Sequence, residues 1–265
     1  KKKRVAIVGA GPAGMQAALT ATERGHDVTL FEKQDRLGGA LYHVGIPDFK
    51  LDYRDYMNYI VNAVKDCGAK IVTGIEVDAD MLANGNFDVI IVATGASTFK
   101  PPIEGIEDES ILDPLKVLEG KIPEGKNVVV CGAGLVGCEV SMFLAEKGKD
   151  VTMIDKLPDL DPDMPIYTKW VLNSKLAELG IKIKLNHEIV KMTGKNVSCK
   201  HGDSIIDFDA DAVVCALGLK PRKELTEKLR EKLKGTNVEI IPVVDTNSPR
   251  KIMQAVHEGF HAARR

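Results

Sequence analysis

The sequence predicts an α/β protein that contains two copies of one β-α-β unit, the second inserted in the first. Three observations lead to this fold class. The segment from Arg4 to Gly14 aligns without a gap with the segment from Asn127 to Gly137, at an offset of 132 − 9 = 123 residues. In each copy an apolar, β-rich run ends at a glycine turn, and a helical stretch follows. A final strand-like run and helix have no counterpart before the second copy, so we expect them to complete the first.

The elements of the two copies follow in the same order along the chain. After the glycine turn, Gly25 or Gly148 ends the helix, and a second apolar run ends in Glu32 or Asp155. Later strands are predicted at 87–92 and 211–215, and each leads into small residues, Ala93-Thr94-Gly95-Ala96 and Ala216-Leu217-Gly218. Both copies are therefore expected to be open parallel sheets with ligands at the carboxyl ends of their strands.

The remaining segments set the predicted domain boundaries. The stretch 101–125 is rich in proline, glycine and acids and is interpreted as a linker, and 224–234 is predicted as a solvated, charged helix. A strand is expected at 237–244 and a helix at 251–265. The prediction is a split first domain, residues 1–104 plus 237–265, and a second domain of residues 105–236.

Composition excludes several function classes. The 265 residues are 44% hydrophobic and 28% charged, which is typical of a globular protein. A formal charge of −2 and 5% aromatic residues give neither a basic field nor stacking platforms, so no nucleic acid partner is expected. The apolar runs are much shorter than the ~20 residues that span a bilayer, so no membrane association is expected.

Five cysteines are dispersed without a C-x-x-C pair. This argues against a structural disulfide set, a zinc site and a dithiol relay, and a reducing, cytoplasmic compartment is expected. Cys131 and Cys138 are interpreted as small buried hydrophobes. No metal site is predicted, because only His257 and His261 show a spacing of the zinc type and they lie near the carboxyl end of the sequence.

The paired Gly-x-Gly-x-x-Gly motifs carry the chemistry. Each follows a buried strand, opens a helix and has an acid 23 residues after its first glycine (32 − 9 and 155 − 132). The first glycine permits the tight turn, the second lets a pyrophosphate approach the backbone, and the third allows close helix packing. The helix N-terminus holds the anion, and the acid accepts hydrogen bonds from ribose hydroxyls.

With these motifs the chain resembles the two-dinucleotide-binding-domain flavoproteins. It is similar in particular to the carboxyl-terminal half of the NADH:flavin oxidoreductases that include 2,4-dienoyl-CoA reductase and 2-enoate reductase. The resemblance covers nearly the whole chain and rests on the two glycine motifs, 32–39, 93–96, 216–218 and 249–259. It implies two Rossmann-like dinucleotide-binding domains, FAD in the first and NADH or NADPH in the second, with hydride passing from nicotinamide to FAD.

The resemblance assigns site residues in both domains. For FAD it indicates Gly9, Gly11, Pro12, Ala13, Gly14, Glu32, Lys33, Arg36, Gly38, Gly39, Val77, Ala93, Thr94, Gly95 and Asp245. For NAD(P)H it indicates Gly132, Gly134, Leu135, Val136, Gly137, Asp155, Lys156 and Gly218. No catalytic side chain is named, since the cofactors carry hydride transfer. Tyr42 and His43 either line the flavin or serve packing.

In the larger relatives an amino-terminal barrel carries FMN and a 4Fe-4S cluster, and electrons pass from FAD through the cluster to reduce an enoate or dienoyl C=C bond. The barrel and a four-cysteine cluster motif are absent from this sequence. The resemblance therefore implies that the barrel is supplied in the same polypeptide or by a partner subunit.

Two choices stay open. Where the family usually shows Gly-Asp at the last strand, this chain has Val244-Asp245, which leaves a noncatalytic module that holds only ADP as an alternative. A role like that of the small subunit of glutamate synthase is another. Asp155 favours NADH because a carboxylate repels a 2′-phosphate, whereas Lys156 and Lys149 could pair with one and so leave NADPH open.

Overall fold

The computed structural model describes residues 1–160, 164–243, 246 and 251–265. The chain forms two compact units, one of Lys1–Ser97 with Lys220–Arg265 and one of Thr98–Leu219. It passes between them through the strands β5 (Ala96–Thr98) and β13 (Leu219–Pro221), which form a two-stranded sheet. The insertion of one α/β unit in the other confirms the predicted fold class.

The first unit contains a five-stranded parallel sheet in the order β14-β4-β1-β2-β3. Its strands are β1 (Arg4–Val8), β2 (Asp27–Phe31), β3 (Lys70–Val72), β4 (Val89–Val92) and β14 (Glu239–Pro242). The edge strand β14 lies far along the chain from β4 and pairs with it in register from Glu239 and Val89. The late segment therefore completes the first sheet, as the sequence predicts.

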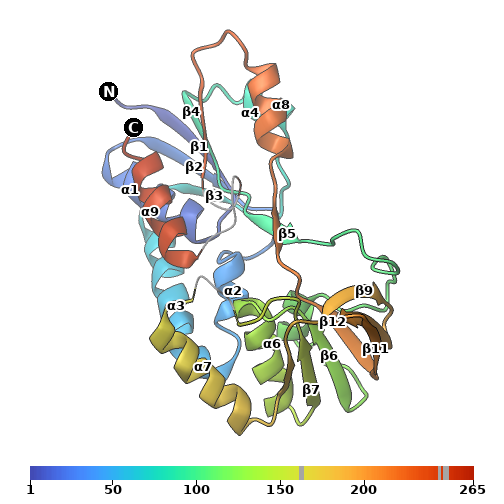
Figure 1. Ribbon diagram of the computed structural model, residues 1–265. Helices are drawn as coiled ribbons and strands as arrows, with labels where there is room; N and C mark the ends of the chain where they lie inside the picture. The colour runs from blue at the N-terminus through green and yellow to red at the C-terminus, as the bar shows by residue number, and fades with distance from the viewer. Residues whose placement is uncertain (161–163, 244–245, 247–250) are drawn as a thin grey trace. The chain divides into compact units, whose positions relative to one another are not determined.

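Helices cover both faces of this sheet. Alternate residues of β1 enter different cores: Val5 and Ile7 pack with one apolar cluster, and Ala6 and Val8 with another. Figure 1 shows α1 beside α9, and α4 beside α8. The helices of this unit are α1 (Pro12–Glu23), α2 (Ala40–Val44), α3 (Leu51–Asp66), α4 (Ala79–Asn84), α8 (Glu224–Lys232) and α9 (Ile252–Ala262), with a 3₁₀ turn, η1, at Asp48–Lys50.

The second unit contains a four-stranded parallel sheet in the order β12-β6-β7-β8 and a three-stranded antiparallel sheet in the order β11-β10-β9. The parallel strands are β6 (Asn127–Cys131), β7 (Asp150–Ile154), β8 (Lys182–Lys184) and β12 (Ala212–Cys215). The antiparallel strands are β9 (Glu188–Met192), β10 (Asn196–His201) and β11 (Ser204–Asp209). Its helices are α5 (Pro114–Leu118), α6 (Leu135–Glu146) and α7 (Ile166–Glu178).

The repeat extends further than the glycine motifs. The offset of 123 residues relates β1 to β6 (127 − 4), α1 to α6 (135 − 12), β2 to β7 (150 − 27) and β4 to β12 (212 − 89). It also relates Asp88 to Asp211, whose carboxylates accept hydrogen bonds from the amides of Arg4 and Asn127 at 2.7 and 2.8 Å. The amides of Asn127 and Lys126 lower the pKa of Asp211. Each unit thus has the same contact between its first and its late strand.

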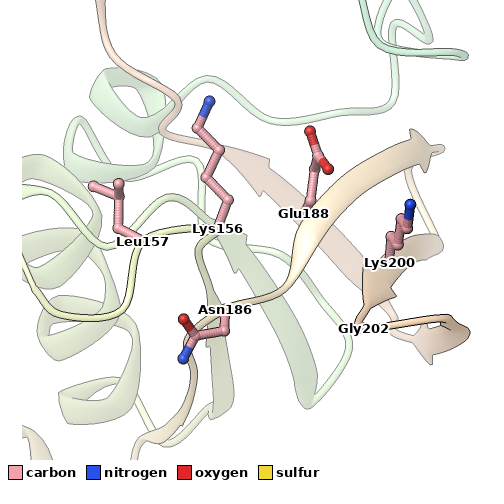
Figure 2. A pocket seen from close by; sticks show the side chains of 6 residues that line it. All are labelled: Lys156, Leu157, Asn186, Glu188, Lys200 and Gly202. Atoms are coloured by element: carbon pink, nitrogen blue, oxygen red, sulfur yellow. The ribbon is translucent and has the colours of Figure 1, made fainter.

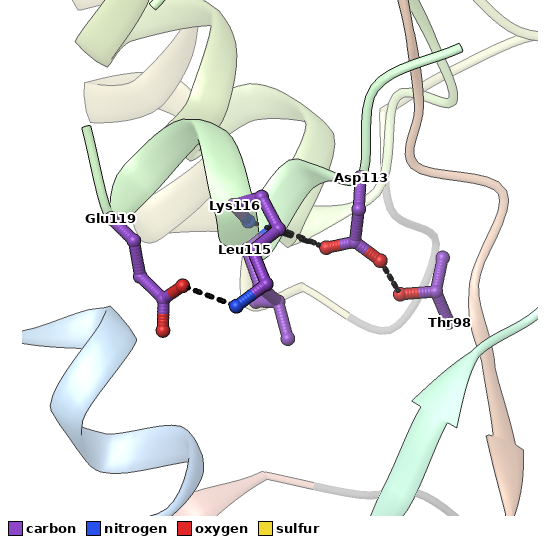
Figure 3. A network of polar contacts seen from close by, with 5 residues as sticks. All are labelled: Thr98, Asp113, Leu115, Lys116 and Glu119. Carbon is purple, nitrogen blue, oxygen red and sulfur yellow. Dashed lines mark hydrogen bonds and ion pairs between the residues drawn. The ribbon is translucent and has the colours of Figure 1, made fainter. Parts of the chain in front are cut away.

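The stretch 101–125 is not a linker, which corrects the prediction. Leu112 donates its amide to Val213 at 2.8 Å and accepts the amide of Cys215 at 3.0 Å, and Ile106 is buried in the core of the second unit. Figure 3 shows Asp113 at the start of α5, where its carboxylate accepts bonds from the amide of Leu115 at 2.8 Å and the hydroxyl of Thr98 at 2.7 Å. The segment belongs to the second unit because its backbone and side chains are bonded there.

The unit boundaries also differ from the predicted 104/105 and 236/237. They lie at 97/98 and 219/220. The charged helix α8 belongs to the first unit because Leu229, which is fully buried, packs with Leu82 and Val92 of that unit. The alternating charges belong to the exposed side of this helix, whereas the buried apolar residues that attach it to the first unit are few and are not evident from the charge pattern.

Candidate functional site

The first glycines of the two motifs have the same backbone geometry. Gly9 has φ +102° and donates its amide to Phe31 at 2.7 Å; Gly132 has φ +111° and donates to Ile154 at 2.7 Å. A Cβ at Gly9 would collide with the carbonyl oxygen of Ala93, and one at Gly132 with that of Ala216. Both turns therefore require glycine for the backbone angle and for the close approach of the late strand.

The second glycines, Gly11 and Gly134, begin helices α1 and α6 with extended backbone angles. Neither helix has a side-chain cap there. A Cβ at Gly134 would meet no heavy atom within 4 Å, and one at Gly11 only the Cα of Gly39 at 4.0 Å. The chain thus leaves space beside the Cα of each of these two glycines, which fits a pyrophosphate that approaches the backbone at a helix N-terminus.

The third glycines pack the helices onto the turns. A Cβ at Gly14 would collide with the carbonyl oxygen of Gly9, and one at Gly137 with that of Gly132. Pro12 and Ala13 occupy the first turn of α1, and Leu135 and Val136 the first turn of α6. The third glycines thus allow both helices to pack closely against the turns that follow β1 and β6.

The strand-end acids are anchored identically. Glu32 accepts the amide of Ala10 at 2.7 Å and that of Gln34 at 2.9 Å. Asp155 accepts the amide of Ala133 at 2.7 Å and that of Leu157 at 2.9 Å. Each carboxylate is thus held beside its glycine turn, and each oxygen keeps a second lone pair that can accept a ribose hydroxyl.

The late strands end beside the same turns. Ala93 donates its amide to Val8 at 2.8 Å, and Ala216 donates to Cys131 at 2.8 Å. Gly95 and Gly218, which follow at the offset of 123 (218 − 95), have φ +69° and +113°. The backbone of Thr94 is held by the segment that follows β13, because Arg222 Nη1 donates a hydrogen bond to the carbonyl oxygen of Thr94 at 3.3 Å. The carboxyl ends of the first, second and late strands therefore meet at one edge in each sheet.

In the first unit, two further glycines, Gly38 and Gly39, contact the glycine turn. Gly38 donates its amide to Ala10 at 2.9 Å, and the Cα of Gly39 lies against Gly11. The guanidinium of Arg36 stacks on Tyr42, 3.9 Å from the ring centre. His43 is buried. The segment 36–43 is thus folded over the helix N-terminus of α1 by backbone contacts.

Lys33 and Val77, two other predicted positions of this unit, lie in different surroundings. Lys33 is half exposed and pairs with Glu76 at 3.6 Å, while Val77 is buried in the core. Val244 and Asp245 lie outside the described residues. Next to them, Thr246 is buried and its hydroxyl donates to the carbonyl of Val92 at 3.3 Å. The chain on either side of the predicted Asp245 is thus close to the end of β4.

The described residues form neither a disulfide nor a group that could hold a metal ion. Cys131 and Cys138 are fully buried, as predicted, and the five cysteines form no disulfide. Burial, with Cys215 and Cys199 nearby, raises the pKa of Cys131 well above its usual range. Among the described residues no group of three or more His, Cys, Asp or Glu side chains could hold a metal ion, and no helix there has the length and hydropathy to cross a bilayer.

A pocket beside Asp155 was missed by the sequence analysis. This pocket of about 440 Å³, which is open to solvent, is lined by Lys156, Leu157, Asn186, Glu188, Lys200 and Gly202 (Figure 2). Its far wall comes from β9 and from β10, and β10 continues into β11 through a hairpin turn at Gly202-Asp203, a turn dipeptide between two strand-like runs. That sequence pattern is enough to predict the hairpin, but it does not indicate that the hairpin packs beside the segment 155–157.

Comparison with known proteins places the geometry in a family. Residues 3–250 match the model of a family described as pyridine nucleotide-disulphide oxidoreductase. An NADH oxidase of Thermoanaerobacter brockii is 34% identical over 99% of this chain and 41% of its own length. A cinnamate reductase of Clostridium sporogenes is 32% identical over 99% of this chain and 39% of its own length.

A solved structure gives the same result at the level of the fold. The complex of 2-naphthoyl-CoA reductase with 2-naphthoyl-CoA superimposes with a TM-score of 0.92 at 30% identity, over 99% of this chain and 40% of that one. The chain therefore spans about two fifths of the length of the relatives that it matches.

Proposed function

Because the chain belongs to the pyridine nucleotide-disulphide oxidoreductase family, we propose that it passes hydride from NADH to FAD. The observation that carries the proposal is the duplicated arrangement of glycine turn, helix N-terminus and anchored carboxylate, built around Glu32 in one unit and Asp155 in the other. Two such sites allow one chain to hold a donor and an acceptor nucleotide.

FAD is proposed for the first unit. The backbone of Gly9, Gly11 and Gly14 would face its pyrophosphate, and Glu32 would accept its adenosine ribose hydroxyls. The close approach of Gly39 to Gly11 supports this assignment, since the lack of a side chain at both positions lets the backbone of Gly38 and Gly39 pack against the glycine turn and the start of α1. Lys33, Arg36, Gly38, Val77, Ala93, Thr94, Gly95 and Asp245 complete the proposed site.

NADH is proposed for the second unit. Gly132, Gly134 and Gly137, with Leu135 and Val136, would hold the pyrophosphate, and Asp155 would accept the 2′-hydroxyl of the adenosine ribose. Lys156 and Gly218 complete the site. When bound, the cofactors supply the chemistry: a hydride, two electrons with one proton, leaves the dihydronicotinamide for the flavin. The residues of the chain bind and orient, and none is proposed as an acid or base.

The electrons are proposed to continue to a second redox module with a 4Fe-4S cluster and FMN that reduces an enoate or dienoyl C=C bond. Support comes from the relatives, which are longer than this chain and include a cinnamate reductase and a 2-naphthoyl-CoA reductase. Disulfide reduction is disfavoured, because no two of the five cysteines have the C-x-x-C spacing and four of them are buried.

The test is the visible spectrum of the protein saturated with FAD, washed, and treated anaerobically with NADH. A retained flavin band that NADH bleaches supports the hydride-entry role. A protein that retains ADP but no flavin would favour the noncatalytic module and refute the redox role. Bleaching followed by electron transfer to a glutamate synthase large subunit, and not to an enoate-reducing barrel, would favour the small-subunit alternative.

A further inference from the structure

The pocket beside Asp155 is joined to that residue by backbone hydrogen bonds. His187 donates its amide to the carbonyl of Asp155 at 2.9 Å, and Asn186 donates to that of Leu157 at 3.0 Å. Asn186 has φ +57°, a left-handed conformation in which its own amide faces Leu157 while Glu188 begins β9. The segment 186–188 therefore runs alongside 155–157, and Glu188 lines the pocket together with Lys156 and Leu157.

The opposite wall of the pocket, formed by the end of β10, is held in position by contacts of two histidines. His187 and His201 stack with ring centres 4.2 Å apart, and Nδ1 of His201 lies 2.9 Å from the carbonyl oxygen of Asn186. These contacts fix the end of β10, and with it Lys200 and Gly202, against the segment 186–188. In Figure 2 the side chains of Lys156, Glu188 and Lys200 extend to the same side of the ribbon.

The charged side chains that line the pocket oppose one another. Lys156 and Lys200 contribute two positive charges, and Glu188 contributes one negative charge. A 2′-hydroxyl is neutral, so these charges do not disfavour it. A 2′-phosphate carries close to two negative charges at neutral pH, and Glu188 offsets one of the two positive charges that would otherwise attract it.

We propose that this pocket receives the 2′ side of the adenosine ribose and that Glu188 is a specificity-determining residue that disfavours the 2′-phosphate of NADPH. The inference rests on the proposed binding of a pyridine nucleotide at Asp155. Glu188 acts by its charge, opposing the two lysines that would otherwise make the pocket an anion site. Lys200 acts in the reverse direction, because it would face a 2′-phosphate from β10.

The experiment measures binding of two fragments that lack nicotinamide, AMP and adenosine 2′,5′-bisphosphate, to the FAD-saturated protein by calorimetry. Glu188→Gln is expected to tighten binding of the bisphosphate by about tenfold, the effect of removing one charge near a phosphate in a partly solvated pocket, and to leave AMP unchanged. Adding Lys200→Met to Glu188→Gln is expected to reverse that gain. Glu178→Gln, at the exposed end of α7, is the matched control and should change neither fragment.

Flavin reduction gives a second readout. The ratio of the apparent second-order rate constants for NADPH and NADH should rise in Glu188→Gln by the same factor as the fragment selectivity. An unchanged ratio and unchanged bisphosphate binding would overturn the role of Glu188, while bleaching of the flavin by NADH would leave the proposed function intact. Failure of the unaltered protein to bind AMP and to be bleached by either nucleotide would instead refute the proposed function.

Discussion

Gly134 offers the sharpest test of the second candidate site, because alanine there should fold normally and still lose nucleotide binding. The position has φ −73° and ψ 179°, which alanine adopts without strain, and a Cβ meets no heavy atom within 4 Å. Alanine is a poorer N-cap than glycine, but it also loses less backbone entropy on folding. The two effects oppose each other, so the free energy of unfolding should change by less than about 1 kcal/mol.

The effect on binding should be much larger. The methyl group of Gly134→Ala would occupy the space in front of the first turn of α6, where the proposed pyrophosphate contacts backbone amides. Losing one hydrogen bond to a charged group costs about 1.5–3 kcal/mol. The dissociation constant for NADH should therefore rise roughly 10- to 100-fold, since each 1.4 kcal/mol is about tenfold.

Gly132→Ala is the matched comparison and should behave in the opposite way. Its φ of +111° strains an alanine by about 1–3 kcal/mol, and the Cβ collides with the carbonyl oxygen of Ala216, a backbone atom held by the bond from Ala216 to Cys131. A total loss of about 3 kcal/mol would lower the Tm by roughly 6–12 °C. This variant should fail through folding, whereas Gly134→Ala should fail through binding.

The assay combines thermal unfolding by circular dichroism with anaerobic titration of the flavin band by NADH. The FAD content of Gly134→Ala should equal that of the unaltered protein, because Gly134 lies in the second unit. Normal NADH affinity in a normally folded Gly134→Ala protein would refute the placement of the pyrophosphate. A large loss of stability in that variant would refute the reading of the space around Gly134.

Two further predictions concern packing and thiol chemistry. Gly259→Leu should lower the free energy of unfolding by about 1–3 kcal/mol in denaturant titration, because a side chain there collides with the carbonyl of Ala13 where α9 crosses α1; an unchanged midpoint would contradict this crossing. A thiol reagent at pH 8 should modify Cys67 first and spare Cys199, since burial and then Asp207 raise the pKa of Cys199 to about 11. The thiol form is favoured in the folded protein, so its contribution to stability is complete below pH 9 and should fall as pH rises toward 11; equal stability at both pH values would contradict the shift.

The repeat made the fold class predictable from the sequence. A positive φ and a backbone collision leave only glycine at Gly9 and Gly132, so the motif records backbone geometry directly. The acids Glu32 and Asp155 are likewise held by the amides of Ala10 and Ala133, which lie in the glycine turns that follow β1 and β6. Constraints of this kind can be detected in a sequence because the backbone angle and the neighbouring atoms at one position restrict which residue type can occupy it.

The segment boundaries were not predictable in the same way. In the stretch 101–125, proline and glycine indicate a break in regular structure, yet Leu112 is bonded to a strand a hundred residues later. Helix α8 contains mainly charged residues, and its buried Leu229 packs in one cluster with Leu82, which lies far away in the sequence. Composition describes the exposed side of a segment, whereas the unit to which it belongs depends on long-range partners.

The pocket beside Asp155 shows why specificity is harder to predict than the cofactor site. The glycine motif and the acid lie on consecutive elements, so one stretch of sequence contains the whole constellation. Glu188 and Lys200 belong to an antiparallel sheet that has no counterpart among the described residues of the first unit. The turn at Asn186 and the stacked histidines hold this sheet beside the segment 155–157. The two units therefore have glycine turns of the same geometry, but their proposed ribose sites differ, because the residues that differ come from the segment between the repeated strands β7 and β12.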